Sequence, residues 1–388
     1  MTLKMSDDDF DSHDSGEFVE RTMVFDPAML HASVVDDDEK IHILVQQEGR
    51  DSGRCIEIAD RPLMIGRTGA ADIKLADPRI STRHAELRLV GSALKITDLN
   101  STNGTFVDQR RIQGCVDLPV SSKLTLGSFV FVHEIRSRGN IRKANELHAE
   151  LRKACDYVRA LLPLPLSEGQ VQTDWAYVPC SILGGDAFGY HELDDDRIAF
   201  YLLDVCGHGA GAAMHSVAVI NILRQQSLPG VNFGRPDEVL RALNASFDMD
   251  RHHGMYFSLW YGVYHRKTRT LAYSSGGHPP ALLIGPDRKS VSPLQTRSMS
   301  VGTFPGQRFR TQETIVAPGS SLYIFSDGVF EVVTTEGKEW NFDGFRDLIL
   351  RSREKQAGEA ARLQQAVERI SRTVDFADDF SLIIANFY

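Results

Sequence analysis

The sequence predicts an all-β sandwich followed by a larger α/β (α+β) domain, in which layered antiparallel sheets are flanked by helices. Three observations support this prediction. Short runs of alternating apolar and polar residues recur from Ile41 to Glu134, strand-like and helical patterns mix beyond Pro165, and a helical pattern lies between the two parts. A chain of 388 residues exceeds the usual size of one hydrophobic core, so two domains are expected.

The composition, 42% hydrophobic and 24% charged residues, is that of an ordinary globular protein. No apolar run approaches the ~20 residues that a bilayer span requires, and the acidic N-terminus is unlike a signal peptide. We therefore expect a cytoplasmic protein with no membrane partner. The net charge of −9 disfavours nucleic acid as a partner. The five cysteines show no CxxC spacing, which argues against a disulfide framework or a structural zinc site.

Residues 1–40 are expected to form a disordered acidic tail. Aspartates cluster at residues 7–14 and 36–38, and the one apolar island is Met23-Val24-Phe25.

Residues 41–134 carry the pattern of an all-β sandwich. Turn residues such as Asn103-Gly104 separate short alternating runs. The expected strands are Ile41–Val45, Cys55–Ile58, Leu63–Ile65, Ile73–Leu75, Ala85–Leu89, Leu94–Ile96, Thr105–Val107 and Leu124–Val132.

A linker helix is expected over residues 138–162, because apolar residues there follow alternating steps of three and four: Ala144, Leu147, Leu151, Ala154, Val158 and Leu161. The helix should end at Pro163 and Pro165, which a helix interior would not accept. Two interpretations remain open. The helix packs on the domain that follows, or it forms a short coiled coil that joins two chains in a homodimer.

Residues 163–388 are expected to form the α/β domain. The expected strands are Ile198–Val205, Tyr256–Tyr264, Thr270–Tyr273, Leu322–Phe325 and Phe380–Phe387, and the expected helices are His208–Gln225, Pro236–Asp248 and Gly358–Thr373.

Three short motifs occur in order within the β region: Gly66-Arg67, Ser81-Thr82-Arg83-His84 and Ser101-Thr102-Asn103-Gly104-Thr105. Together they resemble a forkhead-associated (FHA) domain over residues 41–134, which implies phosphothreonine binding. The resemblance also implies that His84 braces the binding loop rather than touching the ligand.

A phosphate dianion is bound through charge-assisted donors such as a guanidinium group, a hydroxyl group and backbone amides. Arg67 offers the guanidinium group. The resemblance implies that Ser81 and Thr82 contact the phosphate oxygens, and that Thr102 and Asn103 hold the peptide backbone beside the phosphothreonine.

Four acidic motifs recur in the second domain: Gly184-Gly185-Asp186, Asp204-Val205-Cys206-Gly207-His208-Gly209, Ser326-Asp327-Gly328-Val329 and Asp378-Asp379-Phe380-Ser381. A buried strand such as Ala199–Leu203 that ends in a carboxylate places charge where only a cation would offset the desolvation. The four motifs therefore indicate a metal site.

These motifs, with Leu162-Pro163 before them and Ser274–Pro280 between the second and third, resemble the SpoIIE-type branch of the protein phosphatase 2C-like, metal-dependent protein phosphatases. The resemblance covers residues 160–388. It implies a β-sandwich flanked by helices, with two Mn²⁺ or Mg²⁺ ions at one edge of the sheets. Both ions accept oxygen ligands in octahedral geometry, so the residues leave the choice between them open.

Carried over by motif, Asp204 bridges both ions, while Asp327 and Asp378 complete one of them. The Val205 carbonyl and Asp186, with waters, complete the other. Asp379 either replaces Asp378 or lies behind it. Such a metal pair lowers the pKa of a bridging water and orients it for in-line attack on phosphorus, which makes Asp204 and Asp327 the catalytic candidates.

Two histidines and a cysteine need separate interpretation. The family has a histidine two residues after the bridging aspartate, where this chain has Cys206, and His208 lies two residues further on. No Cys-x₅-Arg loop follows Cys206, so a thiol phosphatase is disfavoured. His278 and its glycine-rich neighbours are expected to form a hairpin turn rather than to supply a catalytic base.

The resulting hypothesis is a protein serine/threonine phosphatase that acts on phosphorylated regulatory proteins, in a circuit with a serine/threonine protein kinase. SpoIIE-type relatives commonly act on phosphoserine, whereas the FHA resemblance points to phosphothreonine, and both substrates remain open. The chief alternative is a non-catalytic phosphothreonine-binding adaptor. A metal-dependent nuclease or nucleotide hydrolase is disfavoured by the acidic charge and by the lack of a Gly-x₄-Gly-Lys loop.

Thr22 is a candidate phosphorylation site. The segment Glu20–Phe25 resembles the Thr-x-Val-Phe segment that precedes the domain in small bacterial FHA proteins. The resemblance implies that phosphorylated Thr22 binds the chain's own FHA domain at Arg67, Ser81 and Asn103. The alternative is an edge strand or an unstructured segment.

Overall fold

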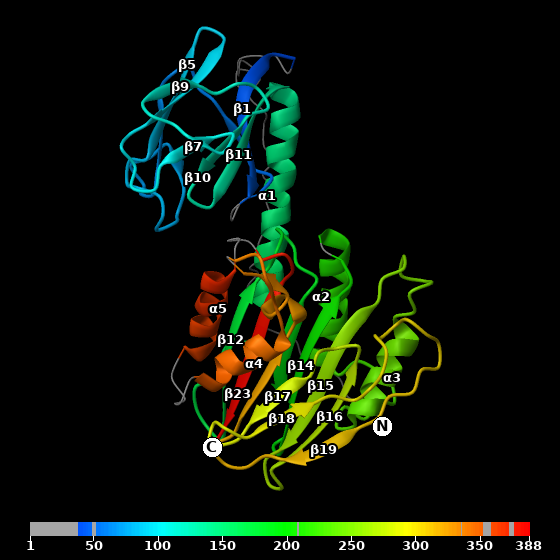
Figure 1. The fold of residues 1–388 in the computed structure, drawn as a ribbon. Coiled ribbons are helices and arrows are strands. Elements are labelled where there is room, and N and C mark those ends of the chain that lie inside the picture. The colour runs from blue at the N-terminus through cyan, green and yellow to red at the C-terminus, as the bar shows by residue number, and fades with distance from the viewer. Residues whose placement is uncertain (1–37, 49–51, 208, 335, 352–357, 372–375) are drawn as a thin grey trace, which may run out of the picture.

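The computed structural model describes residues 38–48, 52–207, 209–334, 336–351, 358–371 and 376–388. The expected helix start at His208 and the tail with Thr22 lie outside these residues. Figure 1 shows a smaller β-sheet part and a larger mixed part, joined by one long helix. Among the described helices, none combines the length and apolarity needed to cross a membrane.

The smaller part consists of two β-sheets that face each other. One sheet has the strand order β2-β1-β11-β10-β7-β8 and the other β4-β3-β5-β6-β9. Their bounds are β1 Lys40–Glu48, β2 Cys55–Glu57, β3 Leu63–Gly66, β4 Ile73–Lys74, β5 Ala85–Val90, β6 Ala93–Asp98, β7 Thr105–Val107, β8 Arg110–Arg111, β9 Cys115–Asp117, β10 Lys123–Leu126 and β11 Phe129–Ser137.

Alternating residues of these strands form one core, which confirms the predicted sandwich. Ile65 and Leu87 from one sheet pack with Leu124 and Phe131 from the other, and all four are fully buried. One of the expected strands was wrong. Leu124–Val132 is two antiparallel strands, β10 and β11, separated by the turn Gly127-Ser128.

Helix α1 (Arg138–Leu161) connects the two parts and packs on both. Near its start, Ile141 is buried against the outer face of β1 and β2. Near its end, Val158 packs with Leu183 and Ala213 of the larger part, and Leu151 lies partly buried beside them. Leu147 faces solvent with 62% of its surface exposed. The apolar residues of this helix therefore make contacts within the chain near both ends of the helix, whereas Leu147 in its middle remains exposed.

The larger part is a sandwich of two five-stranded antiparallel sheets, with orders β12-β23-β20-β17-β18 and β13-β14-β15-β16-β19. Their bounds are β12 Val171–Val178, β13 Ala187–Glu192, β14 Arg197–Val205, β15 Phe257–His265, β16 Thr270–Gly276, β17 Ala281–Ile284, β18 Val291–Leu294, β19 Gln312–Ile315, β20 Ser321–Phe325 and β23 Phe380–Phe387. A small ribbon pairs β21 (Val332–Val333) with β22 (Glu339–Trp340).

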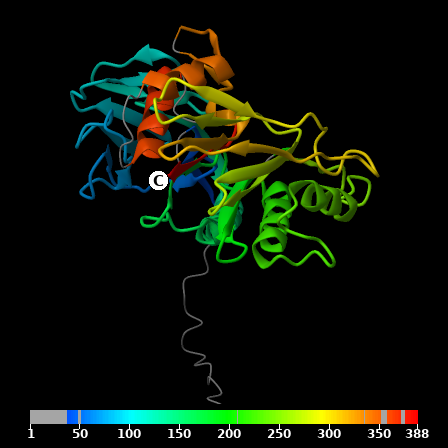
Figure 2. The same ribbon diagram turned by 90° about the horizontal axis from the view of Figure 1, so that it is seen from below.

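Helices cover the outer faces of both sheets, as Figure 2 shows. Helices α2 (Ala210–Gln225) and α3 (Pro236–Ser246) pack on β14 and β15. Helices α4 (Phe342–Arg351) and α5 (Glu359–Ile370) pack on the other sheet. Phe200, Trp260 and Ile383 fill the space between the sheets. This arrangement confirms the α/β layered sandwich that the sequence predicts.

Candidate active site and phosphothreonine site

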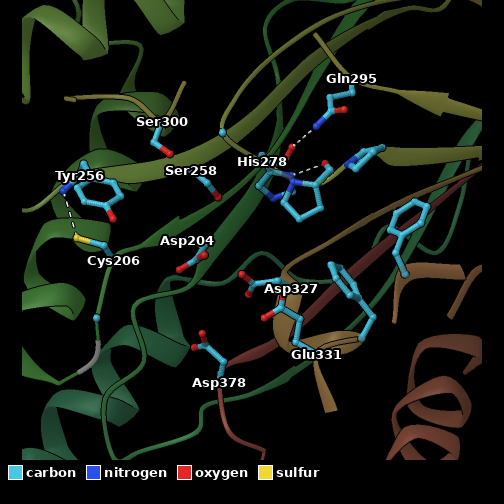
Figure 3. Close-up of a pocket in the computed structure, with 16 residues that line it drawn as sticks. Asp204, Cys206, Tyr256, Ser258, His278, Gln295, Ser300, Asp327, Glu331 and Asp378 are labelled. Atoms are coloured by element: carbon cyan, nitrogen blue, oxygen red, sulfur yellow. Dashed lines mark hydrogen bonds between the residues drawn. The ribbon is translucent and has the colours of Figure 1, made fainter. Parts of the chain in front are cut away.

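A cavity of about 580 Å³ opens where strands β14, β15, β20 and β23 begin or end. Figure 3 shows four carboxylates directed into it, those of Asp204, Asp327, Glu331 and Asp378. Neither lysine nor arginine occurs among the described residues that line the cavity. The described lining residues therefore concentrate negative charge without a lysine or arginine among them to balance it.

Strand ends bring these carboxylates together. Asp204 is the penultimate residue of β14, opposite Ser258 on β15. Asp327 follows β20, and Asp378 precedes β23. Strands β20 and β23 are neighbours in one sheet, with Phe325 paired to Leu382. Three of the four predicted acidic motifs thus reach one cavity through ordinary strand pairing.

The adjacent residues Asp378 and Asp379 have different environments. Asp378 lines the cavity. Asp379 is only 2% exposed, and its carboxylate accepts hydrogen bonds from the backbone N–H groups of Cys180 at 2.8 Å and Asp186 at 3.0 Å. Asp379 therefore holds the segment from Cys180 to Asp186 in place.

Asp186 and Val205 lie behind the cavity rather than in its lining. Both are buried, with 2% and 1% of their surfaces exposed. The Asp186 Oδ2 and Asp327 Oδ1 atoms are also buried, and neither has a hydrogen-bond partner among the described residues. Unpaired buried carboxylate oxygens are costly, because burial removes their water.

The pKa shifts of these carboxylates also indicate a site that binds a cation. Burial, with Asp327 and Asp378 nearby, raises the pKa of Asp204 to about 7. Burial and the charges of Asp378 and Glu331 raise the pKa of Asp327 to about 6. The pKa of Asp186 is raised by burial and by Asp204 and Asp379. A divalent Mg²⁺ or Mn²⁺ ion would offset the repulsion between these carboxylates and would give their unpaired buried oxygens a partner. Carboxylate oxygens are also the hard donors that these ions prefer, so the residues fit such ions.

The sequence reasoning missed Glu331. Its backbone N–H donates to the Asp327 carbonyl at 2.8 Å, and its side chain lines the cavity one turn after Asp327. The four-residue spacing to Asp327 was the available signal, because a turn after a strand returns residue i+4 to the side of residue i.

The expectation of a hairpin turn at His278 was wrong. Its segment joins β16 of one sheet to β17 of the other, so it is a crossover and not a hairpin turn. His278 is 1% exposed and lines the cavity. Cys206 also lines it, and its Sγ accepts the Tyr256 N–H at 3.3 Å.

The three motifs of the smaller part meet on neighbouring loops. The backbone N–H of Arg67 donates to the Ser81 carbonyl at 3.1 Å, and that of Thr102 donates to Ser81 Oγ at 3.1 Å. A Cβ atom at Gly66 would overlap the Thr82 carbonyl oxygen, which explains why glycine precedes Arg67. Arg67, Thr82 and Thr102 are exposed, so the loops offer their donors to solvent.

Side-chain hydrogen bonds of His84 and Asn103 hold these loops together. His84 Nδ1 accepts the Ser81 N–H at 3.1 Å, so its Nε2 carries the proton and donates to the Gly104 carbonyl at 3.2 Å. Asn103 Nδ2 donates to the Arg79 carbonyl at 2.7 Å. The fully buried His84 therefore braces both loops, as expected.

Comparisons with known proteins follow the same two-part division. The family model "Stage II sporulation protein E (SpoIIE)" matches residues 194–388, and the FHA domain model matches residues 63–127. Phosphoserine phosphatase RsbP of Bacillus subtilis is 28% identical over 186 residues, which cover 47% of this chain and 45% of RsbP. FHA domain-containing protein FhaB of Mycolicibacterium smegmatis is 34% identical over 104 residues, which cover 26% of this chain and 67% of FhaB.

A solved structure shows the same fold. The SiaA-PP2C domain of Pseudomonas aeruginosa superposes with a TM-score of 0.56 at 19% identity, covering 63% of this chain and 98% of that domain. The SpoIIE model accounts for half of the chain, and its matched segment contains Asp204, Asp327 and Asp378. The chain therefore belongs to the SpoIIE family of protein phosphatase 2C-type proteins and carries an FHA domain ahead of its phosphatase domain.

Proposed function

We propose that this protein is a Mn²⁺- or Mg²⁺-dependent protein serine/threonine phosphatase that hydrolyses phosphoserine or phosphothreonine on regulatory proteins. The observation that carries the proposal is the convergence of Asp204, Asp327 and Asp378 on one cavity without a lysine or arginine among its described lining residues. A phosphate dianion would be repelled there by protein charge alone. Substrate binding and metal binding are therefore coupled at this site.

The proposed metal ligands follow from the resemblance to the SpoIIE family, and the burial and position of these residues support them. Asp204, Asp327, Asp378, Asp186 and the Val205 carbonyl would hold the ions. When bound, the ions polarise the phosphoryl group and provide a nucleophilic water at neutral pH. Asp379 holds Asp186 in position, because its carboxylate accepts the backbone N–H of Asp186.

The folded chain prepares the site for the ions. Burial of Asp186 and Asp204 costs free energy in the ionised state, so the folded protein is organised to gain from a cation. Cys206 contributes a small side chain whose sulfur accepts a backbone hydrogen bond. No role as nucleophile is assigned to it.

The FHA domain is proposed to dock phosphothreonine, either on partner proteins or on the chain's own tail. Arg67, Ser81 and Thr82 would hold the phosphate, and Thr102 and Asn103 the peptide backbone. Phosphothreonine ligands require a serine/threonine protein kinase in the same circuit. Docking through a separate domain would raise the local concentration of substrate at the active site.

The test is hydrolysis of phosphoserine and phosphothreonine proteins in the presence of Mn²⁺ or Mg²⁺, with and without a chelator. We expect metal-dependent phosphate release that Asp204→Ala and Asp327→Ala each reduce by several orders of magnitude. Asp194→Ala is the matched control, because Asp194 lies in the β13–β14 turn and pairs with Arg197. Unchanged activity in Asp204→Ala would refute the metal assignment. Phosphothreonine binding with no hydrolysis under any metal would identify an adaptor instead.

A further inference from the structure

We infer that His278 is a substrate-positioning residue, whose Nε2 atom accepts a hydrogen bond from the backbone N–H of the phosphorylated residue. This inference rests on the proposed phosphatase function and narrows its substrate class. The favoured substrate is a phosphorylated residue within a peptide chain, as opposed to a small phosphate ester.

His278 lies in the part of the cavity that the metal chemistry does not use. Figure 3 shows His278 and Gln295 on one side of the drawn cavity, and Asp204, Asp327 and Asp378 on another. A phosphoryl group held at the carboxylate side would leave the rest of its residue beside the His278 side.

The hydrogen bonds of the ring define its tautomer. Nδ1 lies 2.9 Å from the Pro279 carbonyl oxygen, which can only accept, so Nδ1 carries the proton. Nε2 therefore presents a lone pair. Burial lowers the pKa of His278 to about 4, so the ring is neutral at neutral pH and is an acceptor rather than a general acid.

The Nε2 atom is buried, and no described residue donates a hydrogen bond to it. A buried acceptor without a donor is unfavourable, so the site favours a ligand that supplies one. The phosphate oxygens and the ester oxygen of the substrate are acceptors only. The nearest donor on a phosphoserine or phosphothreonine residue is its own backbone N–H, which a small aryl phosphate lacks.

The His278 segment is held rigidly, as a positioning role requires. Gln295 Nε2 donates to the His278 carbonyl at 3.0 Å, and the Gly277 N–H donates to the Ser298 carbonyl at 3.0 Å. Gly277 has φ +67°, and a Cβ atom there would overlap Ser300 Oγ. Pro279 follows directly. The acceptor is thus fixed before substrate arrives, which lowers the entropy cost of positioning.

The experiment compares two substrates on the Mn²⁺-loaded full chain: a short phosphoserine peptide and a small aryl phosphate. His278→Leu removes the acceptor, and we expect kcat/KM for the peptide to fall roughly tenfold, mainly through KM, because one hydrogen bond is lost. For the aryl phosphate we expect a change of less than about twofold. His278→Gln, which restores an acceptor oxygen, should recover part of the peptide activity.

His191→Leu is the matched control. His191, in β13, is also a histidine whose ring nitrogens have no described partner, but it packs on Tyr201 of β14 and is not among the cavity residues. It should leave the ratio of peptide to aryl phosphate activity unchanged.

A second measurement requires no mutation of the protein. In a depsipeptide substrate an ester oxygen replaces the N–H of the phosphorylated residue. The wild-type protein should lose the same roughly tenfold factor with this substrate, and His278→Leu should lose nothing further. Two results would overturn the inference without affecting the proposed phosphatase function. One is that His278→Leu lowers kcat/KM equally for the peptide and the aryl phosphate, and the other is that the wild-type protein hydrolyses the peptide and the depsipeptide equally well. Absence of metal-dependent hydrolysis of both substrates by the wild-type chain would refute the proposed function, and the inference with it.

Discussion

The Asp379 carboxylate accepts the backbone N–H of Asp186 at 3.0 Å, across 193 residues of sequence. Its other oxygen accepts the Cys180 N–H at 2.8 Å. One buried side chain thereby fixes the first acidic motif against the last, while its neighbour Asp378 remains in the cavity. Asp379 therefore supports the folded structure around the site, whereas Asp378 can serve the proposed metal binding. Mutation of each residue can separate stability from activity.

Asp378→Asn should reduce turnover by at least about 100-fold, because it removes the charge of a proposed metal ligand, and should leave thermal stability without metal unchanged or raised. Asp379→Asn should instead destabilise the phosphatase domain by about 1–3 kcal/mol. An amide keeps one acceptor oxygen and presents an NH₂ group to the other backbone N–H. Thermal unfolding and turnover, measured on both variants, check the prediction. The reverse pattern would make Asp379 the ligand.

The pH dependence of the metal-free protein should report the buried carboxylates. Folding raises the pKa of Asp204 from 3.8 to about 7, so between these values the folded chain binds more protons than the unfolded chain. Stability should therefore fall as pH rises from about 4 to 7. Asp204→Asn has no charge to bury, so with chelator at pH 7.5 it should melt at least about 2–4 °C above the wild type, a shift that corresponds to roughly 1 kcal/mol.

The comparison at low pH is the control for this experiment. Near pH 4 Asp204 is protonated in the folded wild type, so the two proteins should melt at similar temperatures. Mn²⁺ should raise the melting temperature of the wild type more than that of Asp204→Asn, since stabilisation by a ligand follows its affinity for the folded state. If the melting temperatures of the wild type and Asp204→Asn differed by the same amount at every pH, the assignment of Asp204 to the metal centre would be contradicted.

The fold and the acidic residues at strand ends were predictable because their signals are local. The apolar run Ile198–Val205 predicts a buried strand, and Asp204 at its end is conspicuous for that reason. Gly66-Arg67 was predictable as the first of three short motifs in order, and the structure supplies the reason for its glycine, because a Cβ atom there would overlap the Thr82 carbonyl oxygen.

Other features depend on pairings that a local pattern does not contain. Asp378 and Asp379 are equivalent in sequence, and only the backbone of Cys180 and Asp186 distinguishes them. The glycine- and proline-rich segment around His278 has the composition of a hairpin turn. It is a crossover because β16 and β17 pair with different partners, in two sheets. Strand partners are chosen by non-local packing, which residue composition leaves open.

Arg67→Ala should weaken phosphothreonine-peptide binding at least about tenfold while leaving aryl phosphate hydrolysis nearly unchanged. Loss of a charge-assisted contact costs about 1.5–3 kcal/mol, which is roughly tenfold or more in affinity. Arg88→Ala is the matched control, because Arg88 is exposed on β5 and pairs with Glu86. Calorimetry checks the prediction, and equal peptide affinity in Arg67→Ala and the wild type would refute it.

Helix α1 offers a pair of leucines with different surroundings. Leu151 lies against Leu183 and Val158, so Leu151→Glu should lower the melting temperature and turnover by placing a charge in this contact. Leu147 is 62% exposed, so Leu147→Glu should leave both unchanged and shift any dimer towards monomer. Light scattering and turnover separate the two outcomes. If neither variant changes either quantity, the helix is only a spacer.

Thr22 provides the last prediction, that its phosphorylated form competes with external ligands for Arg67, Ser81 and Asn103. The loops that carry these residues are exposed and held together by His84. A coil of about twenty residues, the separation between Thr22 and Ile41, spans on the order of 25 Å. Tethering at that length gives an effective concentration of about 1 mM, so even a weak phosphopeptide contact would be largely occupied.

Competition measures this directly. Protein phosphorylated at Thr22 should bind an external phosphothreonine peptide at least about tenfold more weakly than Thr22→Ala treated with the same kinase. Combining phosphorylated Thr22 with Arg67→Ala supplies the control, because both the internal and the external ligand then lose the same guanidinium contact. Equal peptide affinities for the phosphorylated protein and Thr22→Ala would exclude self-binding. The FHA domain would then serve as a docking site for other phosphoproteins, since Arg67 would remain open to them whatever the state of Thr22.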